Sequence, residues 1–461
     1  MKLFKHQIEG IKKTIRNKGI CAFYWDVGTG KTRAALEVFK YYKSENKKQK
    51  LFVVCPIALI ESSWADDIRK FCPEYSYENL RKSQTLDADI LLINYEAIIS
   101  KKFRPTLNKV FSDHENTMIV LDESQRIKSY NAKTTKVFLE LSKLLTKKII
   151  MSGSPAPNIE SEYWSQMTFL SQHVFGGNYF SFRNRFFCIS RGNTHIPLGG
   201  LGKREMMSMM QRGYEVKVMP DAKRLLVDNM SPYCMFVNKR EVLDLPDEIN
   251  QVRYIQMTKQ QAKTYKEMWR DMVTEIKGQT ITVPLALAKL MKCRQITGGF
   301  LYNSEGKAIE IEPNPKLNEL KEVMNGIGKD KKVIIFANYK WEIETIRKEF
   351  ASRLSLSLYG ATKDKEGTIR EFSNSRSGVL VAHPLSAGVG LSFNDCDYMI
   401  FYSMDYSYMN YYQCKGRIMR AKKKNNATYI HLLIEKSIDM DIYKAVQEKE
   451  TNNQIFRRLM K

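Results

Sequence analysis

Two blocks of the sequence alternate short apolar runs with segments of helical length, and this alternation limits the fold more than any other feature. Five runs in the first block are expected to be strands: residues 19–25, 51–55, 89–94, 118–121 and 148–151. Five runs in the second block match the same pattern: residues 332–338, 354–359, 378–382, 397–402 and 427–433. Apolar strands separated by helices are typical of parallel sheets that are covered on both faces. The sequence therefore predicts two parallel α/β domains.

The sequence between these blocks has a different character. Residues 160–235 are aromatic, basic and glycine-containing without β alternation, which favours a mostly helical insertion. Glycine pairs and an Asn-Pro step between residues 298 and 330 are typical of a connector. The expected organisation is a first lobe, a helical insertion, a linker with a helical segment, and a second lobe that ends in a basic helix: residues 1–160, 161–245, 246–330 and 331–461.

The composition carries a strong positive charge. The chain has 461 residues, with 74 Lys and Arg against 50 Asp and Glu, and a formal net charge of +24 at pH 7. Hydrophobic residues make up 43% of the chain, enough to fill a core, so disordered and collagen-like classes are excluded. Because a surplus of this size attracts polyanions, the composition indicates nucleic acid as the partner.

The eight cysteines are spread along the chain and form no C-x-x-C pair. We expect them to be reduced core residues, which fits a reducing compartment such as the cytoplasm. No run of about 18 apolar residues occurs, and the first residues contain no apolar signal segment. The sequence therefore predicts neither export nor a membrane partner.

A glycine-rich loop is expected between the first apolar run and the helix that follows it. Its candidate nucleotide-binding residues are Gly28, Thr29, Gly30, Lys31 and Thr32. Glycines allow successive backbone N–H groups to face a phosphate chain at the amino terminus of a helix. Lys31 is expected to reach the terminal phosphates of ATP, and the Thr32 hydroxyl is expected to bind Mg²⁺. Trp25 stands where the strict Walker pattern has glycine, but every phosphate-facing element is kept.

Two further pairs of charged residues complete the chemistry of a P-loop ATPase. Asp122 and Glu123 end an apolar run, so Asp122 is expected to bind Mg²⁺ and Glu123 to polarise the attacking water. Arg417 and Arg420 are three residues apart, which predicts one face of a helix and a role as arginine fingers. Since these arginines are distant from Lys31 in sequence, a site divided between two lobes is expected.

Together these residues resemble the motifs of superfamily 2 nucleic-acid motors, and specifically those of the Swi2/Snf2 family of DNA translocases. The matching segments cover nearly the whole chain: residues 3–10, 53–56 with Trp64, 93–96, 121–128, 150–155 with Asn158, 238–246, Gln261 with Tyr265, 334–336, 359–360, 386–391 and 413–420. The long stretch between Ser154 and Phe336 leaves room for the helical insertions of that family.

The resemblance implies an α/β fold of two RecA-like lobes with a helical insertion, and an ATP- and Mg²⁺-dependent DNA motor. It implies that Gln7 contacts adenine and that Gly388, Gly390 and Gln413 contact the nucleotide. It also implies DNA contacts, mainly to phosphates, and these candidate residues are Pro56, Ser152, Gly153, Ser154 and Ser386.

Three departures from the family pattern bear on activity. Gln125 replaces the usual histidine, and Ser152 and Ser154 replace threonines. Cys414 and Met419 replace the usual alanine and histidine. Because the serines keep their hydroxyls and Gln125 can still hydrogen-bond, we still expect ATP hydrolysis. Any effect is expected in the coupling of hydrolysis to DNA movement.

As a compact, lysine-rich member, the chain resembles phage or bacterial enzymes that remodel branched DNA. The resemblance therefore predicts a helicase or translocase that acts on forks and junctions as a monomer, in the cytoplasm of a bacterial or phage-infected cell. Three alternatives stay open: a duplex translocase that displaces bound proteins or drives a larger assembly, an RNA helicase, and a non-catalytic DNA-binding scaffold. The aromatic residues between 179 and 187 are expected to be core rather than a strand-separating wedge. Nearby arginines are further candidate DNA contacts: Arg183, Arg185, Arg191 and Arg204 with Lys203.

Overall fold

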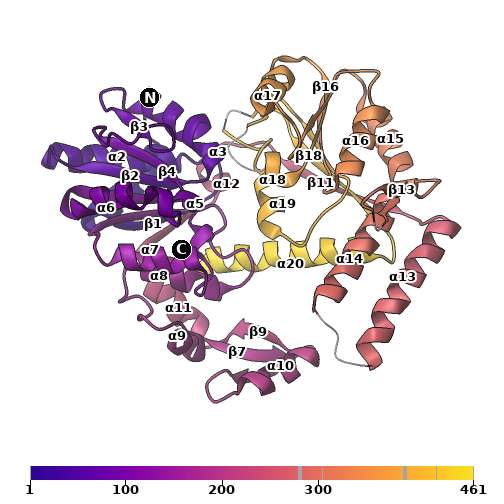
Figure 1. Cartoon of the computed structure of the whole chain (residues 1–461), viewed down its shortest axis with the longest axis horizontal. Helices are drawn as coiled ribbons and strands as arrows, with labels where there is room; N and C mark the ends of the chain where they lie inside the picture. The colour runs from indigo at the N-terminus through magenta and orange to yellow at the C-terminus, as the bar shows by residue number, and fades with distance from the viewer. Residues whose placement is uncertain (1, 279–282, 304, 388–391, 422, 460–461) are drawn as a thin grey trace. The chain divides into compact units, whose positions relative to one another are not determined.

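The computed structural model describes the chain except residues 1, 279–282, 304, 388–391, 422 and 460–461 (Figure 1). Side chains 203, 271–287, 453 and 455–459 are also left out of the description. The chain divides into two compact units, Met1–Leu243 with Thr451–Lys461 and Asp244–Glu450. Each unit contains a parallel sheet with helices, which confirms the predicted pair of α/β lobes.

The sheet of unit 1 has seven parallel strands in the order β10-β1-β6-β5-β2-β4-β3. Its strands are β1 Ile20–Trp25, β2 Lys50–Cys55, β3 Tyr77–Asn79, β4 Ile90–Asn94, β5 Thr117–Asp122, β6 Lys147–Met151 and β10 Cys234–Val237. All five strands predicted in the first block are confirmed. β10 was predicted to be part of the insertion, but it pairs with β1 from Ala22 and Cys234 onward and belongs to the sheet.

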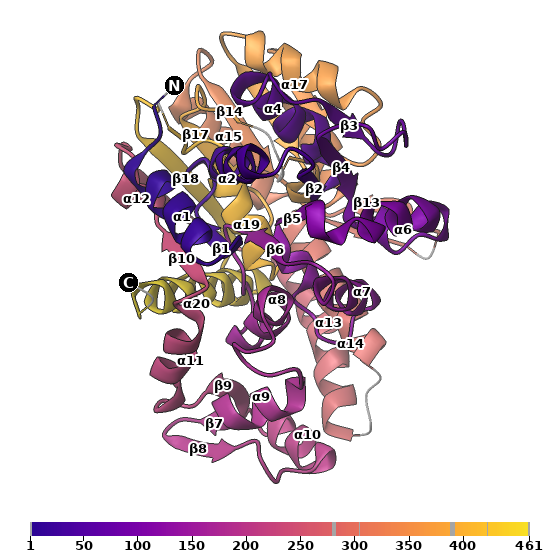
Figure 2. The ribbon, with the colours of Figure 1, turned by 90° about the vertical axis from the view of Figure 1, so that its left-hand side faces the viewer.

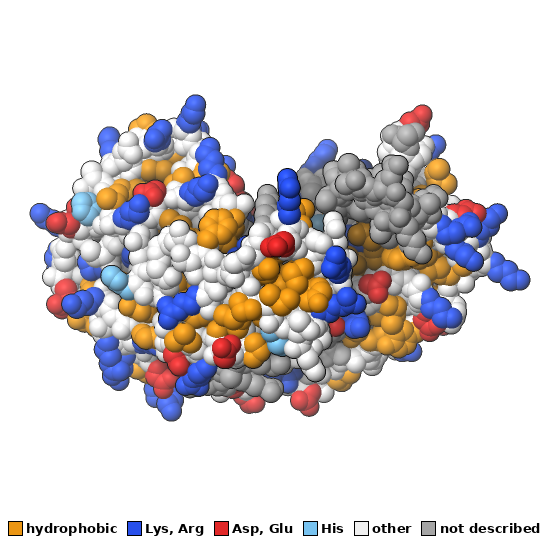
Figure 3. All heavy atoms as spheres, turned by 90° about the horizontal axis from the view of Figure 1, so that it is seen from below, with side chains coloured by type: hydrophobic (Ala, Val, Ile, Leu, Met, Phe, Trp, Pro, Cys, Tyr) orange, Lys and Arg blue, Asp and Glu red, His pale blue; other side chains and the backbone are white. Residues whose placement is uncertain are grey.

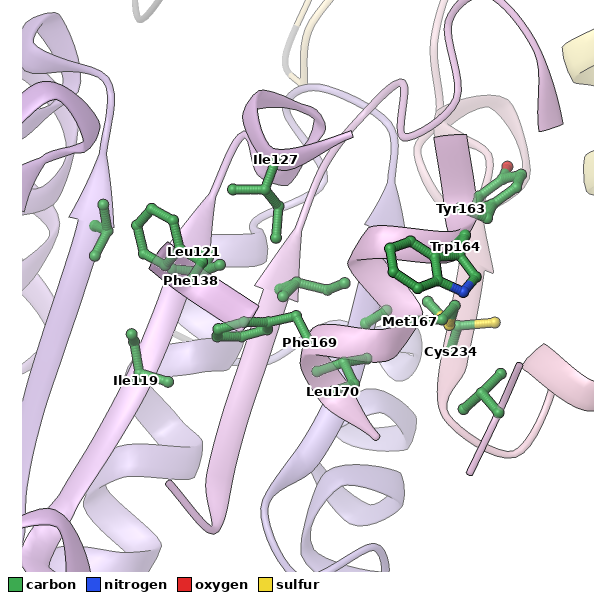
Figure 4. Close-up of a cluster of buried hydrophobic side chains, with 14 of the residues drawn as sticks. Ile119, Leu121, Ile127, Phe138, Tyr163, Trp164, Met167, Phe169, Leu170 and Cys234 are labelled. Atoms are coloured by element: carbon green, nitrogen blue, oxygen red, sulfur yellow. The ribbon is translucent and has the colours of Figure 1, made fainter. Parts of the chain in front are cut away.

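Helices surround this sheet. Those of unit 1 are α1 Lys5–Arg16, α2 Lys31–Glu45, α3 Ile57–Leu59, α4 Asp66–Phe71, α5 Tyr95–Ile98, α6 Arg104–Ser112, α7 Lys133–Ser142, α8 Tyr163–Leu170, α9 Tyr179–Phe186, α10 Lys203–Gln211, α11 Ala222–Met230 and α12 Lys239–Val242. Every residue of α8 is buried, and Figure 4 shows its Trp164, Met167 and Phe169 among the core side chains. Phe169 meets Phe138 of α7 edge to face, so α8 is part of the core of unit 1.

The segment between β6 and β10 contains a small antiparallel sheet in addition to its helices. This sheet has the strand order β8-β7-β9, formed by β7 Phe187–Arg191, β8 Thr194–Pro197 and β9 Glu215–Val218. It lies beside α9 and α10 (Figures 1 and 2). The prediction of a mostly helical insertion missed this sheet, whose β8 and β9 are short and largely exposed, so they bury little of the apolar sequence that marks a strand.

Unit 2 is built on six parallel strands in the order β11-β18-β17-β14-β16-β15. They are β11 Glu248–Ile255, β14 Lys332–Phe336, β15 Ser355–Leu358, β16 Gly378–Ala382, β17 Tyr398–Phe401 and β18 Ala427–Ile434. All five strands predicted in the second block are confirmed. β11 was predicted to be linker, but it pairs along its whole length with β18. Most of its side chains are exposed, as on an edge strand, so it lacks the apolar run of a central strand.

Helices cover both faces of the unit 2 sheet. They are α13 Lys259–Gly278, α14 Val283–Gly298, α15 Pro315–Ile327, α16 Lys340–Glu349, α17 Lys365–Asn374, α18 Pro384–Ala387 and α19 Tyr408–Lys415, with a hairpin of β12 Phe300–Tyr302 and β13 Ala308–Glu310. α20 Ile438–Leu459 begins in unit 2, and its residues from Thr451 onward belong to unit 1. Ile334 and Phe336 of β14 lie in one hydrophobic cluster, and Val333 and Ile335 lie in another. Because successive side chains of a strand point to opposite faces, β14 is buried on both. α15, expected in the linker, packs on this sheet.

Two expectations about the whole chain can be compared with the described residues. All eight cysteines are buried and none forms a disulfide, as predicted for core residues. Among the residues described, none of the helices combines the length and the apolar character needed to cross a lipid bilayer.

Candidate active site

The glycine-rich loop lies between β1 and α2. Gly28 and Gly30 have φ values of 86° and 82°, in the left-handed region that favours glycine. Gly28 is exposed, and α2 begins at Lys31 directly after Gly30. The first N–H groups of a helix have no partner within the helix, and the helix dipole adds positive potential there. The loop can therefore bind an anion such as a phosphate chain.

Two buried side chains of α1 fix this loop from behind. Gln7 Nε2 donates to the Gly30 carbonyl at 3.0 Å, and its Oε1 accepts from the Phe4 backbone N–H at 2.9 Å. His6 Nε2 lies 2.9 Å from the Thr29 carbonyl, and burial lowers the pKa of this imidazole. Gln7 thus connects the start of α1 to the glycine-rich loop. Its predicted contact with adenine stays a prediction.

Replacing Gly30 with alanine is expected to disrupt this loop. A Cβ at Gly30 would lie 2.3 Å from Gln7 Nε2, and the residue has a left-handed φ. Such strain costs about 1–3 kcal/mol of unfolding free energy, and we expect a parallel loss of ATP affinity. Denaturant unfolding and a nucleotide-binding titration measure both. Gly326→Ala in α15 is the matched control, because its Cβ meets nothing within 4 Å. Wild-type unfolding and ATP binding by Gly30→Ala would contradict the prediction.

The lysine and the threonines of the loop have distinct environments. Lys31 Nζ donates to the Trp25 carbonyl at 2.9 Å and to the Asp26 carbonyl at 3.2 Å. The Thr29 hydroxyl also donates to the Asp26 carbonyl, at 2.8 Å, so this hydroxyl stabilises the loop itself. Thr32 lies in the first turn of α2 and is half-buried. These contacts place the ammonium of Lys31 at the loop that the sequence assigns to phosphate.

Asp122 ends β5 with its carboxylate in a defined setting. Trp64 Nε1 donates to Asp122 Oδ2 at 2.9 Å, and the Glu123 backbone N–H donates to Oδ1 at 3.0 Å. The Tyr95 hydroxyl donates to the Asp122 carbonyl at 2.8 Å. Burial, aided by the charge of Glu123, raises the pKa of Asp122 to about 6, and the ammonium of Lys31 opposes this rise. The structure therefore brings the lysine of the loop and the carboxylate of β5 into one electrostatic site.

Glu123 has an unusual backbone conformation for a residue with a side chain. Its φ is 56°, in the left-handed region, immediately after the buried strand β5. Such strain in a non-glycine residue persists only where the surrounding structure determines it, and it is common at functional sites. The surrounding structure therefore holds the half-buried Glu123 in this backbone conformation, directly after the buried Asp122.

A chain of hydrogen bonds runs from Glu123 to the loop after β6. Gln125 Nε2 donates to Glu123 Oε2, and the Ser152 hydroxyl donates to Gln125 Oε1 at 2.7 Å. The Ser154 backbone N–H donates to the Ser152 hydroxyl at 3.0 Å. We name these four residues the Glu123–Ser154 relay. It connects the candidate catalytic carboxylate to residues that the resemblance assigns to DNA.

The predicted DNA-contacting residues of unit 1 are buried. Pro56 precedes α3, and Ser152, Gly153 and Ser154 follow β6. The Ser152 hydroxyl is fully buried and both donates and accepts within the Glu123–Ser154 relay. Contact between these residues and DNA stays a prediction, and the positioning of Gln125 by Ser152 is the role visible in the structure.

Gln125→Ala removes the hydrogen bond between the Gln125 amide and the Glu123 carboxylate. We expect it to lower DNA-stimulated hydrolysis at least about tenfold, because a hydrogen bond to a charged partner contributes about 1.5–3 kcal/mol. Ser152→Ala should cost less than Gln125→Ala. The double variant should cost less than the sum of the two, since the residues act in one chain of hydrogen bonds. Steady-state ATPase rates of the three variants test this, and strictly additive losses would contradict the relay.

A second buried amide connects the same two loops. The Ser124 hydroxyl donates to Gln166 Oε1 at 2.8 Å, and Gln166 Nε2 donates to the Pro155 carbonyl at 2.7 Å. Sequence reasoning missed Gln166, and it assigned no role to Trp64 or Tyr95. A signal was available for Gln166, because a glutamine within the apolar segment that forms α8 must find hydrogen-bond partners once it is buried.

The remaining site residues lie in unit 2. Gln413 is buried on α19, whereas Ser386 is half-buried on α18. The predicted contacts of Gly388 and Gly390 fall outside the described residues.

Arg417 and Arg420 were predicted to share a helix face, and this is wrong. α19 ends at Lys415 and Gly416 caps it, so Arg417 lies in the turn that follows and Arg420 lies in the irregular segment after that turn. Arg417 is buried, and Arg420 Nε donates to the Gly416 carbonyl at 3.2 Å. Burial, together with the charge of Arg417, lowers the pKa of Arg420 to about 9. Their approach to the phosphates bound in unit 1 stays a prediction.

Comparisons with known proteins agree with this geometry. Residues 6–298 match the SNF2-related domain, and residues 315–422 match the helicase conserved C-terminal domain. Over 97% of its length the chain is 24% identical to the SWI/SNF-related matrix-associated actin-dependent regulator of chromatin subfamily A-like protein 1 homolog of Caenorhabditis elegans, and the match spans 61% of that protein.

Two further relatives match very different shares of the chain and of their own length. Protein p41 of Acyrthosiphon pisum secondary endosymbiont phage 1 is 23% identical over 89% of the chain and 88% of its own length. The human DNA annealing helicase and endonuclease ZRANB3 is 26% identical over 38% of the chain and 16% of its own length. Since the SNF2-related model matches well over half of the sequence, the chain belongs to the SNF2-related family of helicase-class ATPases.

Proposed function

We propose that the chain is an ATP- and Mg²⁺-dependent DNA motor that remodels branched DNA, such as forks and junctions, as a monomer. One observation carries the proposal. Lys31 of the phosphate-binding loop and Asp122 at the end of β5 share one electrostatic site, with Glu123 directly after Asp122. This set of groups is what ATP hydrolysis by a P-loop enzyme requires.

The residues present fit a magnesium nucleotide. The left-handed Gly28 and Gly30 leave backbone N–H groups at the start of α2 for phosphates. Oxygen ligands are the ones that Mg²⁺ prefers, and Asp122 with Thr32 would supply them. Bound Mg²⁺ neutralises charge that develops on the phosphates. Gln7, Gly388, Gly390 and Gln413 are the further proposed nucleotide contacts.

Each charged residue then has a proposed task in hydrolysis. Glu123 would polarise the attacking water and take up its proton, because its carboxylate follows the metal ligand Asp122 directly. Lys31 would stabilise negative charge on the terminal phosphate. Arg417 and Arg420 would stabilise the same charge from the second unit, as arginine fingers.

DNA is the proposed polyanion because of the family and the charge. The net charge is +24, and Figure 3 shows Lys and Arg side chains scattered over one face of the molecule, with acidic side chains among them. Contacts between basic side chains and the phosphates of DNA do not depend on the base sequence, and salt weakens them. Pro56, Ser152, Gly153, Ser154 and Ser386 are the proposed DNA contacts. The match to a relative named as a DNA annealing helicase and endonuclease supports DNA as the substrate.

The test is steady-state ATP hydrolysis with no DNA, single strand, linear duplex, fork and four-way junction at matched nucleotide concentration. Stronger stimulation by forks or junctions than by duplex is the expected result. Equal stimulation by plain duplex would replace branch remodelling with translocation against bound proteins. Greater stimulation by structured RNA would identify an RNA helicase, and hydrolysis that no nucleic acid changes would overturn the DNA motor for the chain alone.

A second candidate is the motor of a larger assembly. The chain spans about 61% of the length of the Caenorhabditis elegans relative, so that relative has sequence with no counterpart here. Under this alternative, ATP hydrolysis by the isolated chain stays low with every DNA and rises when a partner is added. A non-catalytic scaffold would instead bind DNA and show no hydrolysis under any condition.

A further inference from the structure

Three aromatic side chains form a cluster on unit 1 that the ATP site does not use: Tyr130, Tyr179 and Phe180. Tyr130 lies between Gln125 and Ser152 in sequence, whereas Tyr179 and Phe180 begin α9. The rings of Tyr130 and Tyr179 are stacked, with centroids 3.8 Å apart and planes 7° apart. The Phe180 ring meets each of them edge to face at 5.7 Å. Two segments distant in sequence therefore build one aromatic surface.

Exposure separates Phe180 from the other aromatics of this region. Its side chain is 54% exposed, while Phe182 and Phe186 are 1% exposed and Phe187 is fully buried. The last three therefore belong to the core, as the sequence predicts, but the same prediction is wrong for the exposed Phe180. Phe186 and Phe187 cannot act as a wedge at the surface. Tyr130 and Tyr179 are half-buried. Of the aromatic residues between 179 and 187, all of which the structure describes, only Tyr179 and Phe180 expose part of their side chains to solvent, and Tyr130 adjoins both.

The aromatic cluster is mounted on the core. The Tyr179 ring packs edge-on against the buried Trp164 of α8 at 5.5 Å. Two residues before Tyr130, Lys128 Nζ lies 2.9 Å from Glu162 Oε1. Both supports come from elements that pack in unit 1, so the rings are held in place before any ligand arrives. Preorganisation of this kind reduces the entropy cost of binding.

The sequence around the aromatic cluster is basic. Residues 124–139 contain four Lys or Arg and no Asp or Glu, and residues 172–204 contain five and none. The two segments that supply the rings therefore carry no acidic side chain of their own, although Arg126 and Lys128 pair with Glu96 and Glu162 of other segments. Sites for single-stranded nucleic acid combine a positively charged surface, which follows the backbone, with aromatic rings on which bases stack.

We propose that Tyr130, Tyr179 and Phe180 form a stacking site for an unpaired base of a DNA strand. A base inside a duplex is already covered on both faces, so this surface would select DNA that has unpaired bases, as forks and junctions do. The inference rests on the proposed DNA motor and adds a substrate class to it. It also separates two tasks, because nucleotide hydrolysis belongs to Lys31, Asp122 and Glu123 and base recognition belongs to the aromatic cluster.

The test is the affinity of three variants of the full chain for a labelled single strand, a fork and a blunt duplex. Phe180→Ala is expected to weaken single-strand and fork binding about tenfold, which is the range measured for loss of one base–aromatic stack. Duplex binding and duplex-stimulated hydrolysis should be unchanged. Phe180→Trp should bind as the wild type does. Tyr41→Ala is the matched control, because Tyr41 is 39% exposed on α2 of the same unit.

A second readout reports stacking directly. An unpaired 2-aminopurine in the fork should change its fluorescence on binding the wild type and Phe180→Trp, and not on binding Phe180→Ala. The stacking site is overturned if Phe180→Ala binds single strands as tightly as the wild type, if it loses duplex affinity equally, or if the wild type binds no single strand. A different result would overturn the proposed motor, namely that no DNA stimulates ATP hydrolysis by the wild type.

Discussion

Glu123→Gln is expected to lower DNA-stimulated ATP hydrolysis by about 100- to 10,000-fold, the usual contribution of a general base. Glutamine has the same shape and keeps a hydrogen-bonding oxygen, but it cannot take a proton from the attacking water. Asp122, Trp64 and Lys31 are untouched, so the proposed contacts to phosphate and Mg²⁺ should remain. ATP binding and DNA binding should therefore stay within a few-fold of the wild type.

Single-turnover hydrolysis and an ATP-binding titration measure the two quantities separately. Glu96→Gln is the matched control, because Glu96 is an exposed carboxylate that pairs with Arg126 and has no contact with Asp122 among the described interactions. Substantial hydrolysis by Glu123→Gln would show that another group is the base. Loss of ATP binding together with hydrolysis would show that the substitution disturbed the left-handed turn at residue 123.

Lys31→Ala should abolish both tight ATP binding and hydrolysis. The hydrolysis rate should fall at least about 100-fold, which is typical when an enzyme loses one fixed positive group that stabilises negative charge in the transition state. The variant also leaves Asp122 without the ammonium that opposes the rise of its pKa, so this buried carboxylate becomes easier to protonate and a weaker metal ligand. Both effects act in the same direction.

Lys40→Ala on the same helix is the control for Lys31→Ala. Lys40 lies 3.7 Å from Glu37 and 3.5 Å from Glu74, and a partly exposed pair of this kind contributes little to stability. Hydrolysis and thermal unfolding of Lys40→Ala should match the wild type. If Lys31→Ala kept full activity with a normal unfolding temperature, the phosphate-binding loop would have been assigned to the wrong segment.

The central strands of both sheets could be predicted because burial on both faces demands apolar sequence throughout. β5 and β14, for example, are buried along their whole length. Edge strands obey no such demand. β11 is mostly exposed and the two middle residues of β10 are half-buried, so neither has the apolar run by which the central strands were predicted. The hairpin of β7 and β8 turns at Gly192, whose φ is 58°, followed by Asn193. Gly-Asn between two short runs is a hairpin signal that the sequence offered.

The candidate site was predictable where its chemistry is local in sequence. Gly30 precedes Lys31, and Asp122 precedes Glu123, so short segments carry the essential spacing. The groups that fix them come from distant segments, as Trp64 does for Asp122 and Gln7 does for Gly30. No spacing rule connects such pairs. The helix expected around Arg417 fails for a local reason, because glycine at 416 favours a helix end.

The amide in the Glu123–Ser154 relay gives that chain of hydrogen bonds a fixed polarity. Gln125 turns its NH₂ group to the carboxylate and its oxygen to the Ser152 hydroxyl, and the reverse orientation would set oxygen against oxygen at Glu123. An imidazole at this position could gain a proton near neutral pH and invert one of its bonds. An amide cannot. Because the Gln125 amide does not titrate, this residue keeps the direction of both of its hydrogen bonds, and a change in the relay at this position requires movement of a side chain.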